Sequence, residues 1–216
     1  MDSNTQEKIT SEDIYDYCKS MSSAVPDYLN GLEEKSKSTN QLKMISGPYL
    51  GLFLGMISKI INPQYILEIG TFTSYGTICL AQGLGQDGKI VTLEKNESLK
   101  GFADEFIESS GFKNHIIQYF GDAQEIIPQL DYTFDLVFID AAKRQYIDYY
   151  EAVIGKVRSG GIIVADNVLW KGTILDKTRD KLADGLDAFN KHVSGDSRVE
   201  NIILPIDDGL HLIRKK

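Results

Sequence analysis

The sequence predicts a doubly wound α/β fold with a mostly parallel, seven-stranded sheet. Three observations lead to this class. From about residue 64 onward, short β-branched runs alternate with helix-like stretches. The runs are continuously apolar, which is typical of parallel strands buried on both faces. The last two runs lie too close together for a helical crossover, so one strand must be reversed.

The expected strands and helices follow one another along the chain. Five β-branched runs are predicted as parallel strands: Tyr65–Ile69, Lys89–Glu94, His115–Phe120, Phe134–Asp140 and Gly161–Asp166. The stretches between them have the length and composition of helices: Gly76–Leu84, Ser98–Ser110, Ala123–Leu130 and Gln145–Val157. Right-handed crossovers between parallel strands place such helices on both faces of a sheet.

Two further runs, Val199–Ile206 and Gly209–Arg214, are separated only by Asp207 and Asp208. So short a connection is typical of a hairpin, and we therefore expect these two strands to be antiparallel. Near the other end of the chain, Ser11 is a candidate N-cap for a helix. A helical N-terminal arm is therefore expected to precede the sheet.

The composition indicates one globular domain over residues 1–216, with the helical arm at 1–45 and the core at 46–216. Hydrophobic residues make up 42% of the chain, yet no apolar run approaches the ~18 residues of a membrane span. Two cysteines exclude a disulfide framework and, with an N-terminus unlike a secretory signal, favour the cytoplasm. The net charge of −8 disfavours a large nucleic-acid footprint but leaves a local basic patch open.

The first expected strand leads into a turn from Gly70 to Gly76, whose spacing lets the backbone pass tightly beneath a ligand before a helix begins. In open parallel sheets, ligands bind beyond the carboxyl ends of the strands, where this turn lies. The turn lacks the three glycines of a dinucleotide fingerprint, because Phe72 interrupts them, and it lacks the lysine of a P-loop. A plain strand-to-helix turn is the alternative.

Acidic residues at successive strand ends indicate what the ligand is. Glu94 ends the second strand, 24 residues after Gly70, where a carboxylate can accept hydrogen bonds from both hydroxyls of a ribose. Glu68, assigned to the first turn, favours S-adenosylmethionine (SAM), because a carboxylate is attracted to a sulfonium or ammonium group and repelled by pyrophosphate. Asp122 and Ala123, after the third strand, are placed to meet an adenine edge. Each acid taken alone is equally compatible with a helix cap.

The fourth and fifth strands end in Asp140 and in Asp166-Asn167. If these strands are neighbours, two carboxylates and an amide oxygen converge, and such hard ligands suit Mg²⁺, Mn²⁺ or Ca²⁺. Helix capping is again the alternative. Lys143 lies three residues past Asp140, where a lysine beside a metal can act as a base. Without the metal site, an ordinary surface lysine is the better interpretation.

Taken in order, these segments resemble a known family. The runs LEIGTFTSYGTICLA, VTLE, GDA, FDLVFIDAAKRQYIDYYE and GGIIVADNVLWKG are similar to those of the cation-dependent class I O-methyltransferases, the caffeoyl-CoA and catechol O-methyltransferase-like group. The similarity extends from about Met44 to the C-terminus. It implies a Rossmann-like class I methyltransferase fold, SAM as co-substrate, a divalent cation and a homodimer with the arm at its interface.

The resemblance also implies roles for individual residues. The implied cofactor-binding residues are Ser46, Glu68, Gly70, Thr71, Ser74, Gly76, Glu94, Asp122, Ala123 and Asp140. The implied metal ligands are Asp140, Asp166 and Asn167, and the implied catalytic residues are Asp140 and Lys143, the latter as general base. Tyr146 and Trp170 would wall the site, with core packing as the alternative for both.

Some residues depart from the family pattern. Ser74 stands where the family usually has glycine, and Gly76 where it usually has serine or threonine. Ala142 replaces a frequent aspartate, while Leu50 and Lys171 occupy positions that are often glutamine and often glycine or asparagine, respectively. These departures bear on cofactor affinity and on the choice of acceptor rather than on the metal ligands.

The predicted reaction transfers a methyl group from SAM to a hydroxyl of a catechol-like small molecule. Two alternatives stay open. One is methylation of 5-hydroxyuridine in tRNA, for which a basic patch would consist of Lys35, Lys37, Lys43, Lys171 and Lys177. The other is a SAM-binding protein without catalysis, which the departures at positions 74, 76 and 142 suggest. A nicotinamide dehydrogenase is disfavoured by the missing glycine pattern.

Overall fold

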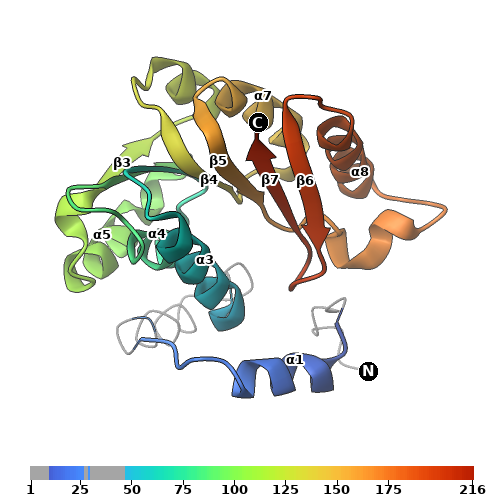
Figure 1. Ribbon diagram of the computed structural model, residues 1–216, viewed down its shortest axis with the longest axis horizontal. Helices are drawn as coiled ribbons and strands as arrows, with labels where there is room; N and C mark the ends of the chain where they lie inside the picture. Colours follow the sequence, from blue (N-terminus) through green and yellow to red (C-terminus); the bar gives the residue numbers. More distant parts are fainter. Residues whose placement is uncertain (1–9, 27–28, 30–46) are drawn as a thin grey trace.

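The computed structural model describes residues 10–26, 29 and 47–216, and within them seven strands form one sheet (Figure 1). The strands are β1 (Tyr65–Ile69), β2 (Lys89–Glu94), β3 (Ile116–Phe120), β4 (Phe134–Ile139), β5 (Val157–Ala165), β6 (Val199–Leu204) and β7 (Leu210–Lys215). Their order across the sheet is β3-β2-β1-β4-β5-β7-β6. Strands β1 to β5 pair in parallel, and β7 runs antiparallel to both β5 and β6. The predicted fold class is confirmed.

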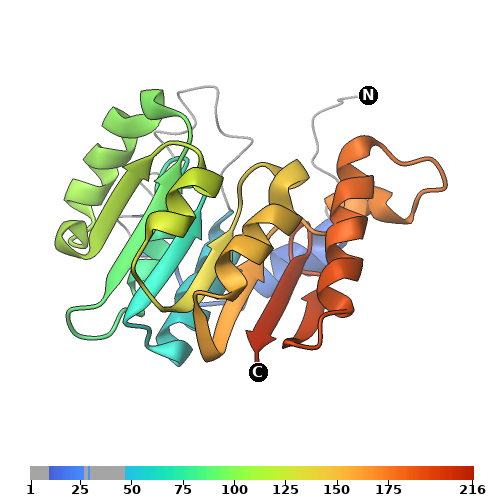
Figure 2. The ribbon, with the colours of Figure 1, turned by 90° about the horizontal axis from the view of Figure 1, so that it is seen from above.

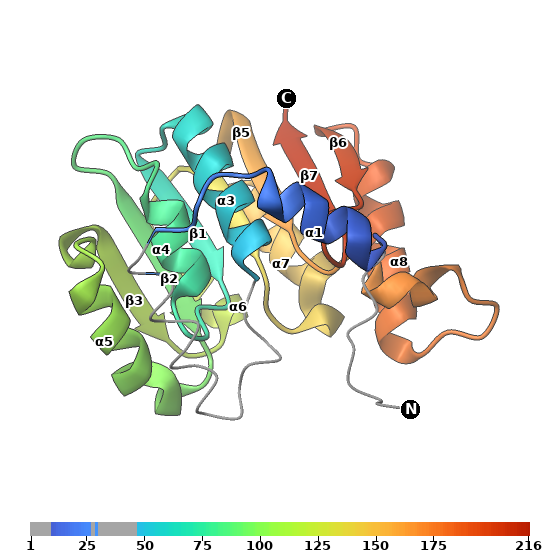
Figure 3. The same cartoon turned by 90° about the horizontal axis from the view of Figure 1, so that it is seen from below.

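Helices cover both faces of the sheet (Figure 2). They are α1 (Glu12–Ser20), α3 (Pro48–Ile61), α4 (Tyr75–Ala81), α5 (Lys100–Ser109), α6 (Ala123–Ile126), α7 (Tyr146–Ile154) and α8 (Lys181–Ser194). One core cluster joins α3, α4 and α5 to the sheet through side chains such as Leu54 and Phe106. The other joins α6, α7 and α8 through side chains such as Tyr150 and Phe189. Helix α1 lies on the same side as α3 and α4 (Figure 3).

The strands form where the sequence is continuously apolar. In β4, five of the six residues are buried, because this strand lies between β1 and β5 with helices on both faces. Burying both faces of such a strand removes two sets of side chains from water, which stabilises the centre of the sheet. The site at the strand ends is therefore supported by a buried part of the sheet.

Several predicted boundaries differ from the structure. Helix α4 ends at Ala81 rather than Leu84, and α7 ends at Ile154 rather than Val157. Strand β5 begins at Val157, four residues before the predicted start at Gly161. The early start has a physical cause: Val157 pairs with Phe134, and a bulge follows before the regular ladder with β4 resumes at Ile162.

Helix α8 was not among the predicted helices, although its signals are present in the sequence. Asp180 caps it, since its carboxylate accepts hydrogen bonds from the backbone N–H groups of Leu182 and Ala183, each at 2.8 Å. Buried Leu186, Phe189 and Val193 then recur at helical spacing. Strands β6 and β7 pair antiparallel, as predicted, but their connection is longer than the two residues expected: residues 205–209 join them.

The N-terminal predictions are only partly covered by the described residues. Helix α1 begins directly after Ser11, as predicted, but the Ser11 side chain makes no capping hydrogen bond. Ser46 and the segment 35–40 lie outside the described residues. Among the described helices, none combines the length and the apolar character needed to cross a membrane.

The strand order identifies the ligand-binding edge. The chain leaves β1 toward β2 on one side, whereas β4 and β5 lie on the other, so the order reverses between β1 and β4. Such a reversal opens a crevice beyond the carboxyl ends of the two strands. The crevice is bordered by the residues that follow β1 and β4, which begin at Gly70 and Asp140.

Candidate active site

The turn after β1 passes very close to the end of β4. Gly70 has φ = +104°, and a β-carbon at this position would lie 2.1 Å from the carbonyl oxygen of Asp140. Only glycine permits this backbone conformation together with so close an approach. The N–H groups of Gly70 and Thr71 both donate to the carbonyl of Leu93, at 2.9 and 3.2 Å. The turn is therefore fixed to β2 on one side and packed against β4 on the other.

Ser74 occupies a strained position at the end of this turn. Its φ is +67°, a left-handed conformation that costs a residue with a side chain about 1–2 kcal/mol. The residue is fully buried, and its Oγ has no hydrogen-bond partner within the described part of the chain. A buried hydroxyl of this kind is normally paired. The hydroxyl of Ser74 is therefore available as a hydrogen-bonding group at the end of the turn.

Glu68 lies inside β1 rather than in the turn where it was placed from the sequence. Only 1% of the residue is exposed, and Oε2 accepts hydrogen bonds from the hydroxyls of Thr77 and of Thr92, the latter at 2.6 Å. The hydroxyl of Thr71 lies 2.5 Å from that of Thr92 and extends the network. Burial raises the pKa of Glu68 to about 8, so its carboxyl group is mostly neutral at pH 7 in the absence of a ligand.

Glu94 ends β2 at the edge of the crevice. Its Oε2 accepts from the N–H of Phe72 at 2.9 Å, and its Oε1 accepts from the N–H of Asn96 at 2.8 Å. The residue is half-buried. Because each carboxylate oxygen has two lone pairs, one bond to each oxygen leaves further acceptor capacity for a ligand. The position is the one predicted for a ribose contact.

Asp122 is a helix cap in the structure. Its Oδ1 accepts from the N–H of Gln124 at 3.0 Å at the start of α6, and its Oδ2 pairs with Lys95 at 2.8 Å. Chiefly because of the hydrogen bond from Lys95, the pKa of Asp122 is lowered. The capping alternative considered for the strand-end acids therefore applies to Asp122. Ala123, the first residue of α6, is buried beside it.

Asp140, Lys143 and Tyr146 form a polar group at the end of β4. The amine of Lys143 donates to Oδ1 of Asp140 at 2.6 Å and to the hydroxyl of Tyr146 at 2.9 Å. Tyr146 in turn donates to the carbonyl oxygen of Asp166 at 2.9 Å. Tyr146 was expected as a wall of the site, and the structure makes it the connection between Lys143 and the end of β5.

The electrostatics of Lys143 follow from these neighbours. Burial alone would lower the pKa of its ammonium group. The interactions with Tyr146, Asp140 and Asp166 outweigh burial, so the pKa of Lys143 is raised and its amine carries a proton in this state. The lysine is thus a half-buried cation held by acidic neighbours.

Asp166 and Asn167 follow directly from β5. Asp166 is 3% exposed, and its Oδ1 accepts from the N–H of Asn167 at 2.7 Å. Burial, followed by the nearby charge of Asp140, raises the pKa of Asp166 well above its usual value. Asn167 has φ = +58°. The N–H of Asp166 donates to the carbonyl of Ile139 at 3.0 Å, which brings the ends of β4 and β5 together as predicted.

The side chains of Asp140, Asp166 and Asn167 supply oxygen donors of the kind that divalent cations prefer. Within the described residues, no three His, Cys, Asp or Glu side chains cluster as a metal site. The predicted set contains only two carboxylates, Asp140 and Asp166, with the amide of Asn167 as its third member. The charge of Asp140 contributes to the raised pKa of Asp166, and a cation bound by both carboxylates and the amide oxygen would favour the ionised form of Asp166.

The structure also identifies two aspartates, Asp180 and Asp208, as partners of Trp170 and Lys171, which the sequence did not indicate. The N–H of Lys171 donates to Oδ1 of Asp208, and burial raises the pKa of that aspartate. Trp170 donates from its indole nitrogen to Asp180 at 3.4 Å. Asp208 comes from the turn before β7, more than 30 residues away in sequence, so no local pattern connects it to the site.

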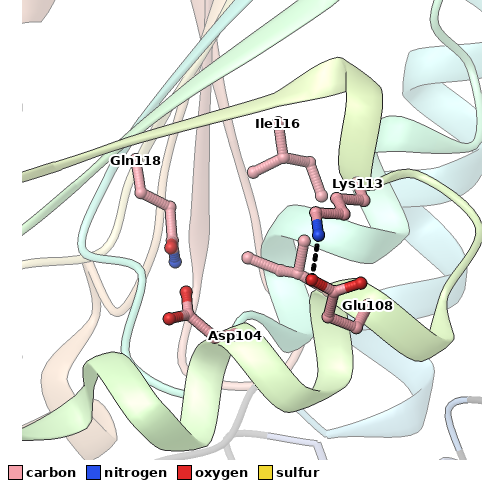
Figure 4. Close-up of a pocket in the computed structure, with 6 residues that line it drawn as sticks. Asp104, Glu108, Lys113, Ile116 and Gln118 are labelled. Carbon is pink, nitrogen blue, oxygen red and sulfur yellow. Dashed lines mark hydrogen bonds and ion pairs between the residues drawn. The ribbon is translucent and has the colours of Figure 1, made fainter.

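A separate hollow lies at the opposite end of β3 (Figure 4). Its lining comes from α5, β3 and the segment between them: Asp104, Ile107, Glu108, Lys113, Ile116 and Gln118. Asp104 pairs with Lys100, and Glu108 pairs with Lys113. Because these charges are already matched and lie away from the strand carboxyl ends, this hollow is not part of the site.

Comparison with known proteins places the chain among O-methyltransferases. A family model described as O-methyltransferase matches residues 19–216. The flavonoid 3',5'-methyltransferase of Vitis vinifera is 33% identical over 178 residues, with 76% of each chain covered. Caffeoyl-CoA O-methyltransferase 1 of Arabidopsis thaliana is 29% identical, covering 96% of this chain and 86% of its own.

A solved structure agrees with these similarities. The O-methyltransferase from Bacillus cereus in complex with SAH superimposes with a TM-score of 0.87 at 28% identity. The alignment covers 94% of this chain and 97% of the other. SAH is the molecule that remains when SAM has given up its methyl group, so the similar protein binds a product of SAM chemistry.

Proposed function

Because the chain belongs to the O-methyltransferase family and is a SAM-dependent O-methyltransferase, we propose that its acceptor is a catechol-like small molecule. We propose further that a divalent cation binds beside the acceptor. The names of the plant relatives, a flavonoid methyltransferase and a caffeoyl-CoA O-methyltransferase, point to phenolic hydroxyls. The observation that carries the proposal is the half-buried contact of Lys143 with Asp140, close to the buried carboxyl group of Asp166.

SAM would bind over the turn after β1. The proposed contacts are Ser46, Glu68, Gly70, Thr71, Ser74, Gly76, Glu94, Asp122, Ala123 and Asp140. Support comes from the free hydroxyl of Ser74, the spare acceptor capacity of Glu94 and the close approach of Gly70 to Asp140. Glu68 would act from beneath the turn, where a cationic ligand favours its ionised form and so lowers its raised pKa.

Asp140, Asp166 and Asn167 would hold the cation. Mg²⁺ suits such oxygen donors, with Mn²⁺ or Ca²⁺ as substitutes. When bound, a divalent cation lowers the pKa of a coordinated hydroxyl and orients its oxygen. Lys143 now donates to Asp140, and Asp166 lies close enough to raise the pKa of the lysine. A divalent cation held by the two carboxylates would repel the ammonium group and favour the neutral amine.

Lys143 is the proposed base. Its neutral amine would take the proton from the acceptor hydroxyl, whose oxygen then bonds to the methyl carbon of SAM. The bond from that carbon to sulfur breaks, and its electron pair stays on sulfur as SAH is formed. Tyr146 holds the amine in place through its hydroxyl. Positioning of two bound reactants supplies much of the acceleration, about 7–11 kcal/mol in favourable cases.

The test is transfer of labelled methyl from SAM to caffeic acid by the full chain, with Mg²⁺ and with a chelator. We expect a methylated product that disappears when the chelator is added. A product that the chelator leaves unchanged would exclude the metal. No product while SAM still binds would exclude a small catechol, and label entering tRNA instead would favour the nucleic-acid alternative over a silent binding protein.

A variant pair tests the base. Lys143→Ala should lower kcat by about 10²–10⁴-fold while SAM affinity changes little. Lys181→Ala, at an exposed position at the start of α8, is the matched control and should leave both unchanged. An unaltered kcat in Lys143→Ala would remove this lysine from the reaction.

A homodimer through the N-terminal arm also remains a proposal. Helix α1 exposes Ile14 by 54% and Tyr17 by 64%, and Met21, just after the helix, is 69% exposed. Their spacing places them on one face of the helix. Sedimentation should show a dimer that Tyr17→Asp weakens, and a monomeric wild-type chain would exclude it.

A cytoplasmic location stays a prediction, in keeping with free Cys18 and Cys79.

A further inference from the structure

A buried histidine lies behind the site, and the proposed reaction does not use it. His211, on β7, is fully buried. Its Nδ1 lies 3.0 Å from Oδ1 of Asn190 on α8, and its Nε2 lies 3.0 Å from Oδ1 of Asn201 on β6. The ring of Phe189 packs against it edge to face at 5.8 Å. Each ring nitrogen therefore faces a side-chain amide.

The orientation of one of these amides is fixed. The amide nitrogen of Asn190 donates to the carbonyl oxygen of Val168 at 2.9 Å, so its oxygen must face His211. His211 can bond to that oxygen only by donating from Nδ1. A neutral imidazole then has an acceptor at Nε2, and Asn201 must present its amide nitrogen there rather than its oxygen. Burial lowers the pKa of His211 to about 4, which keeps the ring neutral at pH 7.

His211 and Asn190 together fix the backbone of Val168 through its carbonyl oxygen. Val168 is fully buried and directly follows Asp166 and Asn167. Its N–H donates to the carbonyl of Gly209 at 3.1 Å, and its carbonyl accepts from Asn190. Both polar groups of this backbone unit are thus tied to elements outside its own loop. Two of the three proposed metal ligands lie immediately before it.

We propose that His211 is a positioning residue, which acts through Asn190 and the carbonyl of Val168 to hold Asp166 and Asn167 in place for the divalent cation. The direction of each hydrogen bond from His211 through Asn190 to Val168 matters. Nδ1–H of His211 keeps the oxygen of Asn190 toward the ring and its nitrogen toward Val168. A reversed amide would place two oxygens against each other at Val168. This inference rests on the metal site of the proposed function.

Two substitutions at position 211 separate the role of Nδ1 from that of Nε2. In His211→Asn, the side-chain amide lies near the former Nδ1 and can still donate to Asn190. In His211→Gln, the longer side chain places its amide near the former Nε2 and leaves Asn190 without its donor. Asn190→Leu removes the link between His211 and Val168. Asn201→Ala is the control that removes only the contact at Nε2.

Two readouts are needed, and neither depends on turnover. The first is Mn²⁺ affinity by calorimetry, measured beside SAM affinity on the full chain. The second is the fluorescence of Trp170, which is the only tryptophan of the sequence and lies three residues after Asn167. The backbone N–H of Trp170 donates to the carbonyl of Asn167 at 3.3 Å. The emission of Trp170 and its quenching by acrylamide therefore report on this segment directly.

We expect His211→Gln and Asn190→Leu to lose about 10–100-fold in Mn²⁺ affinity, as is usual when partners of metal ligands are removed. SAM affinity should stay within about twofold, since none of the proposed SAM contacts belongs to this chain of hydrogen bonds. Both variants should also change the emission of Trp170. His211→Asn and Asn201→Ala should match the wild type in Mn²⁺ affinity and in fluorescence.

The outcomes distinguish this inference from the function on which it rests. If the wild-type chain binds no Mn²⁺, the proposed metal site is wrong, and the Trp170 signal still decides whether His211 orders residues 166–170. If His211→Gln binds Mn²⁺ as the wild type does, with unchanged fluorescence, the inference is overturned. Equal losses in His211→Asn and His211→Gln would also overturn it, because they would indicate packing rather than a directed hydrogen bond.

Discussion

A β-carbon placed on Gly76 would lie 2.7 Å from Oε1 of Glu68. Position 76 faces the buried carboxyl group across the first turn of α4, and Thr77 donates its hydroxyl to the other oxygen of the same group. The glycine at 76, which departs from the family pattern, therefore has a structural reason. It leaves room for a carboxyl group that two threonine hydroxyls hold under the ligand turn.

The first prediction concerns this contact. Gly76→Ala should destabilise the protein by about 1–3 kcal/mol, the usual cost of overpacking, because the new methyl group meets a carboxyl group that cannot move. Urea unfolding measures the change. Gly185→Ala is the matched control: Gly185 lies inside α8 with no atom near its β position, and alanine there should stabilise by about 0.5–1 kcal/mol. Equal effects of the two substitutions would contradict the argument.

The second prediction concerns the hydroxyl of Ser74. Ser74→Ala keeps the strained backbone but removes a buried, unpartnered Oγ, and the free protein should gain about 1 kcal/mol in unfolding free energy. SAM affinity should fall about 3–10-fold, the value of one hydrogen bond. Unfolding and calorimetric titration measure the two effects. Unchanged SAM affinity would mean that the hydroxyl does not contact the ligand.

The third prediction separates stability from metal binding at Asp166. Its folded-state pKa is raised, so its contribution to stability is present at low pH and lost as the pH rises through that value. Asp166→Asn removes the buried carboxyl group, which is costly to ionise, and should raise the unfolding free energy at pH 7 by about 0.5–2 kcal/mol. Mg²⁺ should raise the Tm of the wild type but not that of the variant. A variant that is less stable without metal would refute this.

The fourth prediction is a pH dependence due to His211. Its pKa is about 4 in the folded state against 6.5 in the unfolded chain, so between these values the unfolded state binds more protons. Acidification from pH 6.5 to 4 should therefore cost up to about 3 kcal/mol, a loss that His211→Asn lacks. The measurement is the difference between wild-type and variant unfolding free energies across this range. A flat difference would show that His211 is already charged or is not buried.

The sequence was sufficient for those parts of the fold that depend on local pattern. Apolar runs such as Phe134–Ile139 identify buried strands, and the fixed hand of their crossovers places the strand ends at one edge. Family membership and fold class followed from this order of motifs and are confirmed. The roles of Asp140, Lys143, Asp166 and Asn167 stay predictions, although the structure brings the ends of β4 and β5 together.

The remaining features depend on contacts between distant residues. Glu68 was assigned to a turn, and only the pairing of β1 with β2 reveals that Thr92 lies against it. The hydrogen bonds of His211 join three separate elements, so no spacing in the sequence indicates them. Asp122 could be a cap or a ligand contact on sequence grounds; the placement of Lys95 and Gln124 shows that it caps α6, and its contact with SAM stays a prediction.

The position of β7 affects how the protein is made on the ribosome. Strand β5 pairs with β4 on one side, and its other side has no partner until residues 210–215 insert between β5 and β6. During synthesis, β5 therefore presents an open edge for more than 40 residues of elongation, and such edges promote aggregation. The link from Gly209 to Val168 also has to wait for this late insertion. Conditions that slow the last stage of synthesis should thus increase misassembly of nascent chains and not alter the finished protein.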